Sequence, residues 1–117
     1  MARAALEGVA LQSAELLQAM VAHSPAQVPH VRMDGGAAAN DLLLQMHADF
    51  LDLPVVRPAS VEATAMGAAL VGAVGLGQQA EADLLETFRE ERRFVPNLSP
   101  GRRQRALDQW QRWAPLA

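Results

Sequence analysis

The feature that most constrains this chain is a glycine pair, Gly35-Gly36, which separates two apolar segments of different rhythm. Before the pair, the short run from Val28 to Met33 predicts a strand. After it, apolar residues from Ala38 to Leu51 recur at helical spacing. A glycine turn between a strand and a helix lets the backbone come close to a ligand, because glycine has no Cβ and takes φ > 0 readily.

The helix predicted to begin at Ala38 would point its free N–H groups, and the positive end of its dipole, back at this turn. That arrangement favours an anion or a nucleotide. Asn40 falls in the first turn of the helix, so its amide is placed to face the same pocket. Ordinary tight turns also contain a glycine pair between a strand and a helix, and this second interpretation stays open on geometry alone.

Composition narrows the classes of function. The 117 residues correspond to about one domain, and the net charge of −3 favours neither nucleic acid nor an anionic membrane as a partner. The chain has no cysteine, which excludes disulfides, thiol catalysis and thiolate metal sites, and no lysine, which excludes a lysine-dependent phosphate loop and a Schiff base. The longest apolar run, from Ala63 to Leu76, is shorter than the roughly 20 residues of a membrane span and predicts a buried helix instead.

Strand and helix patterns alternate along the chain, which predicts a parallel α/β arrangement with helices as crossovers. No residue suited to an N-cap precedes the first helix, and we expect that the chain is cut from something longer. The expected elements are a helix over Ala4–Val21, a strand over Val28–Met33, a helix over Ala38–Leu51, a strand over Pro54–Pro58, a helix over Ala63–Val74, an edge strand over Arg92–Pro96 and a last helix from Pro100 to about Trp113 with Ser99 as N-cap.

Three further features favour a structural interpretation. The helix over Ala63–Val74 is rich in alanine and glycine, and we expect it to pack tightly in the core, as the wall behind a site rather than as a ligand contact. His47 lacks a second candidate ligand three or four residues away, so we expect a satisfied side chain rather than a metal ligand. Arg102, Arg103 and Arg105 lack a nucleic-acid-binding motif around them, which favours a solvated face over phosphate binding.

The motif around the glycine pair reads Val31-Arg32-Met33-Asp34-Gly35-Gly36-Ala37-Ala38-Ala39-Asn40. It resembles the adenosine-binding segment of the glycerol kinases, a branch of the FGGY carbohydrate kinases within the actin-like ATPase superfamily. The Asp-Gly-Gly-x-x-x-Asn form points to the glycerol branch, because sugar-kinase relatives usually begin this motif with Gly or Ser. The resemblance covers nearly the whole chain in order, through Ala4–Gln12, Leu43–Met46, Val56–Pro58, Glu62–Ala69 and Glu91–Pro96.

The resemblance implies an α/β fold that is part of a ribonuclease H-like (actin-like ATPase) lobe, helix-rich, with short parallel strands, crossover helices and a C-terminal helix. Residues 1–117 would then be the C-terminal portion of the nucleotide-binding C-terminal domain, with the N-terminal lobe absent. By the same resemblance, Gly35, Gly36, Ala37 and Asn40 would contact the adenosine of ATP or ADP.

The intact enzyme of the family transfers the γ-phosphoryl group of ATP to glycerol, giving glycerol 3-phosphate, with Mg²⁺ as cofactor. The resemblance puts its catalytic aspartate and glycerol-holding residues in the lobe that this chain lacks. We therefore assign no catalytic or metal-binding residue here and expect the isolated chain to be inactive. Asp34 is the one candidate for electrostatics in the cleft, with loop capping as the alternative. Asp41 replaces a common Asn, and we expect its charge to weaken nucleotide binding slightly.

The resemblance also implies a cytoplasmic enzyme with an adenine nucleotide and glycerol as partners, without nucleic acid or a membrane span, and it leaves a homo-oligomer open. Two other classes remain. The chain is a fragment of another FGGY sugar or polyol kinase, or it is a non-catalytic remnant that folds through self-association. In the last case the missing part of the lobe would leave a sheet edge and apolar helix faces bare.

Overall fold

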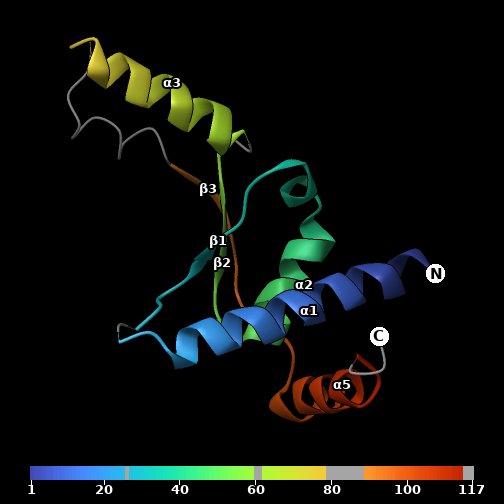
Figure 1. Ribbon diagram of the computed structural model, residues 1–117. Helices are drawn as coiled ribbons and strands as arrows, with labels where there is room; N and C mark the ends of the chain where they lie inside the picture. The colour runs from blue at the N-terminus through green and yellow to red at the C-terminus, as the bar shows by residue number, and fades with distance from the viewer. Residues whose placement is uncertain (26, 60–61, 79–88, 115–117) are drawn as a thin grey trace.

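The computed structural model describes residues 1–25, 27–59, 62–78 and 89–114. Apart from the first strand, which is reduced to two residues, the elements predicted from periodicity are confirmed with small differences in their bounds. In chain order they are α1 (Ala2–Ala22), β1 (Val31–Arg32), the 3₁₀ helix η1 (Gly36–Ala39), α2 (Asp41–Leu51), β2 (Val55–Pro58), α3 (Ala63–Gly75), β3 (Glu90–Phe94) and α5 (Pro100–Trp113) (Figure 1).

The three strands form one sheet in the order β1-β2-β3. β1 runs parallel to β2, with Val31 opposite Val55, and the segment containing α2 is the crossover that parallel strands require. β3 pairs with β2 in the antiparallel direction, with Phe94 opposite Val55. The predicted parallel pair with a crossover helix is therefore confirmed, and the late strand is an antiparallel edge strand.

The core is organised around α2, which contacts α1, β2, β3 and α5. The two ends of this helix are fixed in different ways. At its start the Asn40 side chain accepts a hydrogen bond from a backbone N–H, and at its end Asp52 takes the left-handed conformation that closes many helices. The buried side chains of α2 are Leu43, Leu44, Met46, His47, Ala48, Phe50 and Leu51.

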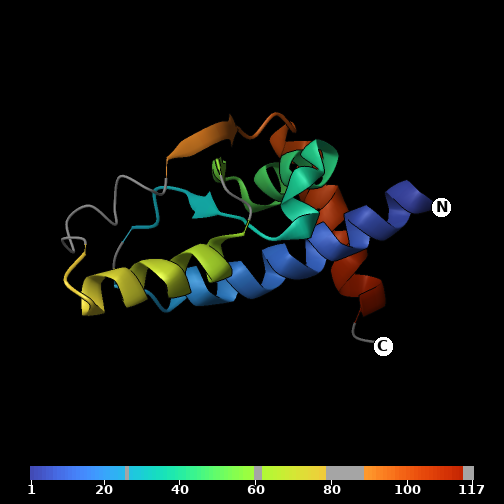
Figure 2. The same ribbon diagram turned by 90° about the horizontal axis from the view of Figure 1, so that it is seen from above.

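Small residues and a polar contact join the three helices α1, α2 and α5. Ala10 and Ala14 of α1 are fully buried, which lets α1 approach α2 closely. Trp110 of α5 donates from Nε1 to the Glu15 carboxylate of α1 at 3.0 Å. Figure 2 shows α5 crossing beside α1. The three helices and the sheet thus enclose one continuous core.

Part of the apolar surface lies outside this core. Val9, Leu16 and Met20 are exposed on α1, although their spacing of seven and four residues puts them on one helical face. The sequence pattern predicts an amphipathic helix here, and the structure covers only one side of it.

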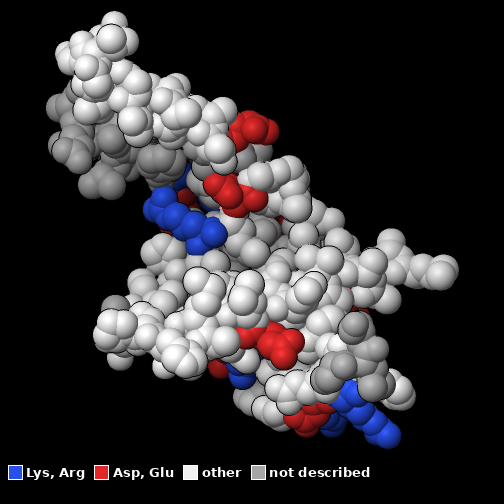
Figure 3. Space-filling model, in the orientation of Figure 1, with Lys and Arg blue, Asp and Glu red and all other residues white. Residues whose placement is uncertain are grey.

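The prediction that the helix over Ala63–Val74 packs tightly in the core is wrong for the described chain. α3 extends away from the body, and its surface is free of charge (Figures 1 and 3). Leu70 is its one buried side chain among those described, and no atom beyond the helix's own nearby backbone lies within 4 Å of a Cβ built on Gly67 or Gly72. An apolar sequence predicts burial but does not say which surface provides it, and no described element covers this helix.

None of the helices in the described ranges combines the length and the hydropathy that crossing a bilayer demands.

His47 is the one buried histidine among the described residues, with 2% of its surface exposed. Its Nδ1–H donates to the Leu43 carbonyl oxygen at 2.8 Å, so the predicted satisfied side chain is confirmed. Burial lowers the pKa of His47 below its ordinary value of 6.5, because the charged imidazolium would lose its hydration inside the core.

This burial predicts a specific pH dependence of stability. Below about pH 6.5 the unfolded chain protonates His47 while the folded chain does not, so the unfolding free energy should fall as the pH drops from there towards the lowered pKa. Urea unfolding between about pH 5 and pH 7 measures this slope, which His47→Gln should reduce. His23→Gln is the matched control, because exposed His23 makes the same contact to a carbonyl four residues earlier. Equal slopes in the wild type and His47→Gln would contradict the assignment.

Candidate functional site

Two segments that the sequence separates meet at one edge of the sheet. Because β1 and β2 are parallel, the segments that follow them emerge at the same carboxyl-terminal edge. After β1 comes the turn Asp34–Asn40, called here the glycine loop, and after β2 comes the start of α3 (Figure 1). The amide of Met33 donates to the Val56 carbonyl at 3.0 Å and holds the entry to the loop against β2.

The glycine loop turns at Gly35, which has φ 82° and ψ 174°. Only glycine adopts this combination without strain, since a Cβ would clash with the neighbouring backbone. The Ala38 amide then donates to the Gly35 carbonyl at 3.0 Å, and the Asn40 amide donates to the Ala37 carbonyl at 3.1 Å. These bonds close a single 3₁₀ turn between the strand and α2. The predicted helix start at Ala38 is therefore wrong, because α2 itself begins at Asp41.

Asn40 is the N-cap of α2 and not a residue of its first turn. Its Oδ1 accepts from the Leu43 amide at 3.2 Å, and its carbonyl oxygen accepts from the Leu44 amide at 3.1 Å. The side-chain oxygen is therefore used to fix the helix. The NH₂ group of this exposed side chain remains as a hydrogen-bond donor beside the loop.

The four predicted site residues lie together on one accessible surface. Gly36, Ala37 and Asn40 are exposed and Gly35 is partly exposed, whereas Ala38 is buried beneath them. No atom of another part of the chain lies within 4 Å of a Cβ built on Gly35 or Gly36. The loop is thus an open backbone surface, and a flat ligand has room to rest on it.

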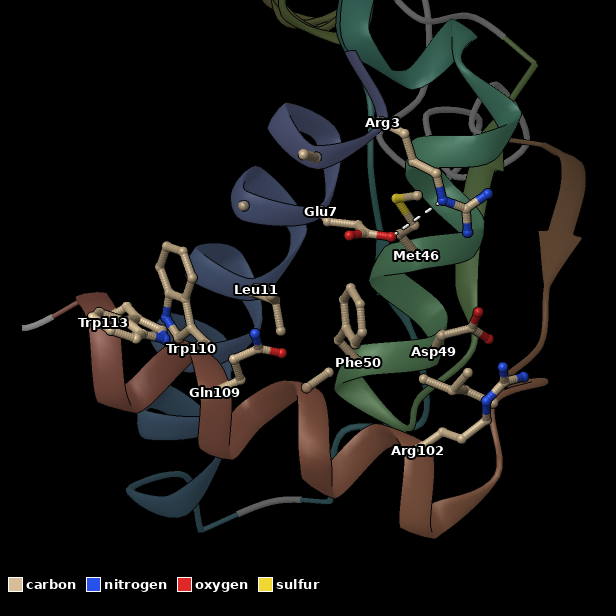
Figure 4. Close-up of a pocket in the computed structure, with 14 residues that line it drawn as sticks. Arg3, Glu7, Leu11, Met46, Asp49, Phe50, Arg102, Gln109, Trp110 and Trp113 are labelled. Atoms are coloured by element: carbon tan, nitrogen blue, oxygen red, sulfur yellow. Dashed lines mark hydrogen bonds and ion pairs between the residues drawn. The ribbon is translucent and has the colours of Figure 1, made fainter. Parts of the chain in front are cut away.

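A hollow lies elsewhere in the structure, between α1, α2 and α5 (Figure 4). Its volume is about 530 Å³, and Met46, Phe50 and Trp110 line its apolar part. The Arg3–Glu7 ion pair spans one side of it. No residue of the glycine loop lines this hollow, so the loop is an open surface separate from it.

Acidic residues near the loop do not form a metal site in the part of the chain that the structure describes. Asp34 is exposed at the end of β1. No group of three or more His, Asp or Glu side chains gathers within the described residues in a way that would hold a metal ion.

The expected effect of the Asp41 charge on nucleotide binding stays a prediction, and the structure shows where this charge lies. Its carboxylate is paired with Arg57, at 2.7 Å from Nη1 to Oδ1, and also with Arg92. These contacts, first of all the hydrogen bond from Arg57, hold the pKa of Asp41 below its ordinary value. The negative charge at the start of α2 is therefore offset by two cations. No pattern in the sequence singles out Arg57 for this contact.

Comparisons with known proteins place this chain in a family and identify structures with a similar fold. The model for the C-terminal domain of the FGGY family of carbohydrate kinases matches residues 1–76. The chain belongs to the FGGY family. Glycerol kinase from Paracidovorax citrulli is 50% identical to this FGGY chain over 115 residues, covering 94% of the chain and 23% of that enzyme.

Two solved structures of kinases share the fold of this FGGY chain. Plasmodium falciparum glycerol kinase with ADP superposes with a TM-score of 0.80 and 23% identity, over 97% of this chain and 23% of that one. Ligand-bound xylulose kinase from Lactobacillus acidophilus superposes with a TM-score of 0.71 and 18% identity, over 99% of this chain and 22% of that one. The chain therefore spans less than a quarter of the length of these relatives, and at such identities the structures establish the fold alone.

The two glycines of the glycine loop should respond differently to alanine. Gly35→Ala should lower the unfolding free energy by about 1–3 kcal/mol, because alanine is strained at the Gly35 backbone angles. Gly36→Ala should be neutral or stabilising by up to about 1 kcal/mol, since its φ lies outside the left-handed region and its surroundings are open. Urea denaturation of both variants measures the difference. Equal losses would show that the turn does not have this conformation.

Proposed function

We propose that this chain is the C-terminal portion of the nucleotide-binding domain of an ATP-dependent glycerol kinase, part of a ribonuclease H-like lobe. Its role in that enzyme is to supply the adenosine-binding loop. The observation that carries the proposal is the glycine loop, an exposed backbone turn at the carboxyl edge of parallel strands in a chain 50% identical to a glycerol kinase.

The adenosine contacts are assigned to Gly35, Gly36, Ala37 and Asn40. Open space above the glycines supports a purine or ribose resting directly on main chain. The exposed NH₂ of Asn40 supplies a hydrogen-bond donor, and the N-terminus of α2 favours the negative charge of the nucleotide. The Plasmodium falciparum relative was solved with ADP, which supports the choice of nucleotide.

This chain's part in the reaction is binding and orientation. Phosphoryl transfer depends on placing ATP and the acceptor hydroxyl in line and on stabilising the phosphoryl charge, which Mg²⁺ supplies in the intact enzyme. The glycine loop would hold the adenosine end of ATP and so fix the direction of the phosphate chain. The acceptor and its catalytic base belong to parts of the kinase beyond this chain, so the chain alone should not turn over ATP.

Glycerol is proposed as the acceptor because the identity to a glycerol kinase reaches 50%. A sugar or another polyol is the second candidate. The xylulose kinase relative keeps that class open, although it shares only 18% identity with this chain.

The bare helix faces support a larger parent protein. Val9 and Leu16 on α1, with Val71 and Leu76 on or beside α3, leave apolar surface in contact with water. We propose that the remaining part of a kinase covers these faces. A second copy of the chain is the alternative, which corresponds to a self-associating remnant.

Titration of ADP into the ¹⁵N-labelled chain tests the loop assignment. We expect amide shifts concentrated at the proposed contacts, with weak affinity because one wall of the site is missing. Gly36→Ala should lower this affinity by about tenfold or more, because the methyl group would occupy the space where the ligand rests.

Gly101→Ala is the matched control for this titration. Gly101 lies in α5, away from the loop, and also has open space around it. Shifts that avoid the glycine loop, or a Gly36→Ala variant that binds ADP as well as the wild type, would contradict the assignment.

A chimaera tests the kinase activity. Replacing the matching last quarter of Paracidovorax citrulli glycerol kinase with this chain should preserve glycerol-dependent ATP turnover in a coupled assay, whereas the isolated chain should show none. The same chimaera carrying Gly36→Ala should have a raised KM for ATP.

Light scattering of the isolated chain distinguishes a kinase fragment from a self-associating remnant. An inactive but folded chimaera, together with a monodisperse dimer of the chain alone, would favour the self-associating remnant.

A further inference from the structure

A single buried cation joins three segments of the chain beside the glycine loop. Arg57 on β2 has 9% of its surface exposed. Its Nη1 donates to the Ala38 carbonyl oxygen at 3.1 Å and to the Asp41 carboxylate at 2.7 Å. Its Nε donates to the Glu91 carboxylate of β3 at 3.0 Å. The guanidinium therefore connects the 3₁₀ turn, the start of α2 and the edge strand.

The chemistry of this contact requires arginine. A guanidinium presents several N–H donors in a fixed plane, whereas an ammonium group is a point charge on a flexible stem. Two carboxylates, from Asp41 and Glu91, compensate the buried positive charge. The guanidinium lies over the ring of Phe94, with Cζ 5.7 Å from the ring centroid, within range of a cation–π contact.

The Ala38 carbonyl is the part of this network that bears on the ligand surface. It lies inside the turn whose outer residues, Gly36 and Asn40, are exposed. When Arg57 holds this oxygen, the peptide plane after Ala38 cannot rotate freely. The backbone N–H groups on either side of this peptide then keep their directions. A loop fixed before the ligand arrives loses less conformational freedom on binding.

We propose that Arg57 is a positioning residue for the glycine loop. It holds the Ala38 carbonyl and the N-terminus of α2 so that Gly36 and Asn40 are presented to the nucleotide in their bound arrangement. Its own side chain is turned away from solvent, so it acts through the loop and not by touching the ligand. The inference rests on the proposed adenosine-binding function.

Three variants of the full chain test the proposal. Arg57→Gln removes the charge and the planar set of N–H donors. Arg57→Lys keeps the charge but not the planar donors, and Arg93→Gln is the matched control. Arg93 carries an ion pair to Glu90 at 2.8 Å within β3. It therefore offers the same loss of charge on the neighbouring strand, without a contact to the loop.

Amide hydrogen exchange without nucleotide gives the first measurement. In Arg57→Gln, exchange at the amides of Ala38, Asn40 and Leu43 should rise about tenfold relative to the α1–α2 core, the loss expected for one hydrogen bond from a charged group. Arg57→Lys should show the same rise at Ala38, and Arg93→Gln should show none. A change spread evenly over the core would indicate a general stabilising role and overturn the proposal.

Titration with ADP gives the second measurement. Affinity should fall about tenfold in Arg57→Gln and in Arg57→Lys and remain unchanged in Arg93→Gln. If Arg57→Lys shows the same amide exchange and the same ADP affinity as the wild type, the proposal is overturned, because a point charge would then suffice. Arg57→Lys also decides the question if Arg57→Gln does not fold. If the wild type itself does not bind ADP, the proposed function fails, and local loss of protection at Ala38 alone still decides whether Arg57 fixes the loop.

Discussion

The parallel pairing of β1 with β2 is the constraint on which the rest of the structure depends. Two parallel neighbours need a crossover, so α2 must return along the sheet and bury its apolar side there. The same pairing brings the glycine loop and the start of α3 to one edge. The position of a backbone turn that is exposed to water is thereby set by contacts buried in the core, through Asn40 and the helix that it caps.

The sequence predicts the elements well where a local signal exists. Helical spacing marks α2, and Ser99 with Pro100 marks the start of α5. The sequence pattern predicts the beginning of α2 three residues too early, because the alanines at 37 to 39 are good helix formers. The choice between a 3₁₀ turn and a continuous helix depends on the Asn40 side chain, which takes the Leu43 amide for itself. Such competition is decided by a single hydrogen bond and leaves no periodic pattern in the sequence.

Two other features were beyond sequence reasoning for a different physical reason. Arg57 meets partners 16, 19 and 34 residues away, so nothing in its neighbourhood reveals the contacts. The apolar composition of α3 predicts that something covers it, but burial is a property of two surfaces, and the sequence of a helix does not say which surface covers it. The four predicted loop residues, in contrast, do lie together, because they are adjacent in the chain and glycine restricts how the turn closes.

The contacts that order the loop and the surfaces left bare belong to different parts of the molecule. The hydrogen bonds to the loop come from Arg57 of β2 and from α2 through the Asn40 cap, while Glu91 of β3 pairs with Arg57. Most of the exposed large apolar residues lie on α1 and on or beside α3, with Leu42 at the start of α2 as an exception near the loop. Among the described residues, the sheet, its crossover helix and the buried Arg57 supply the contacts that hold the glycine loop. If the loop binds a nucleotide as proposed, contacts of this kind lower the conformational freedom that it loses on binding.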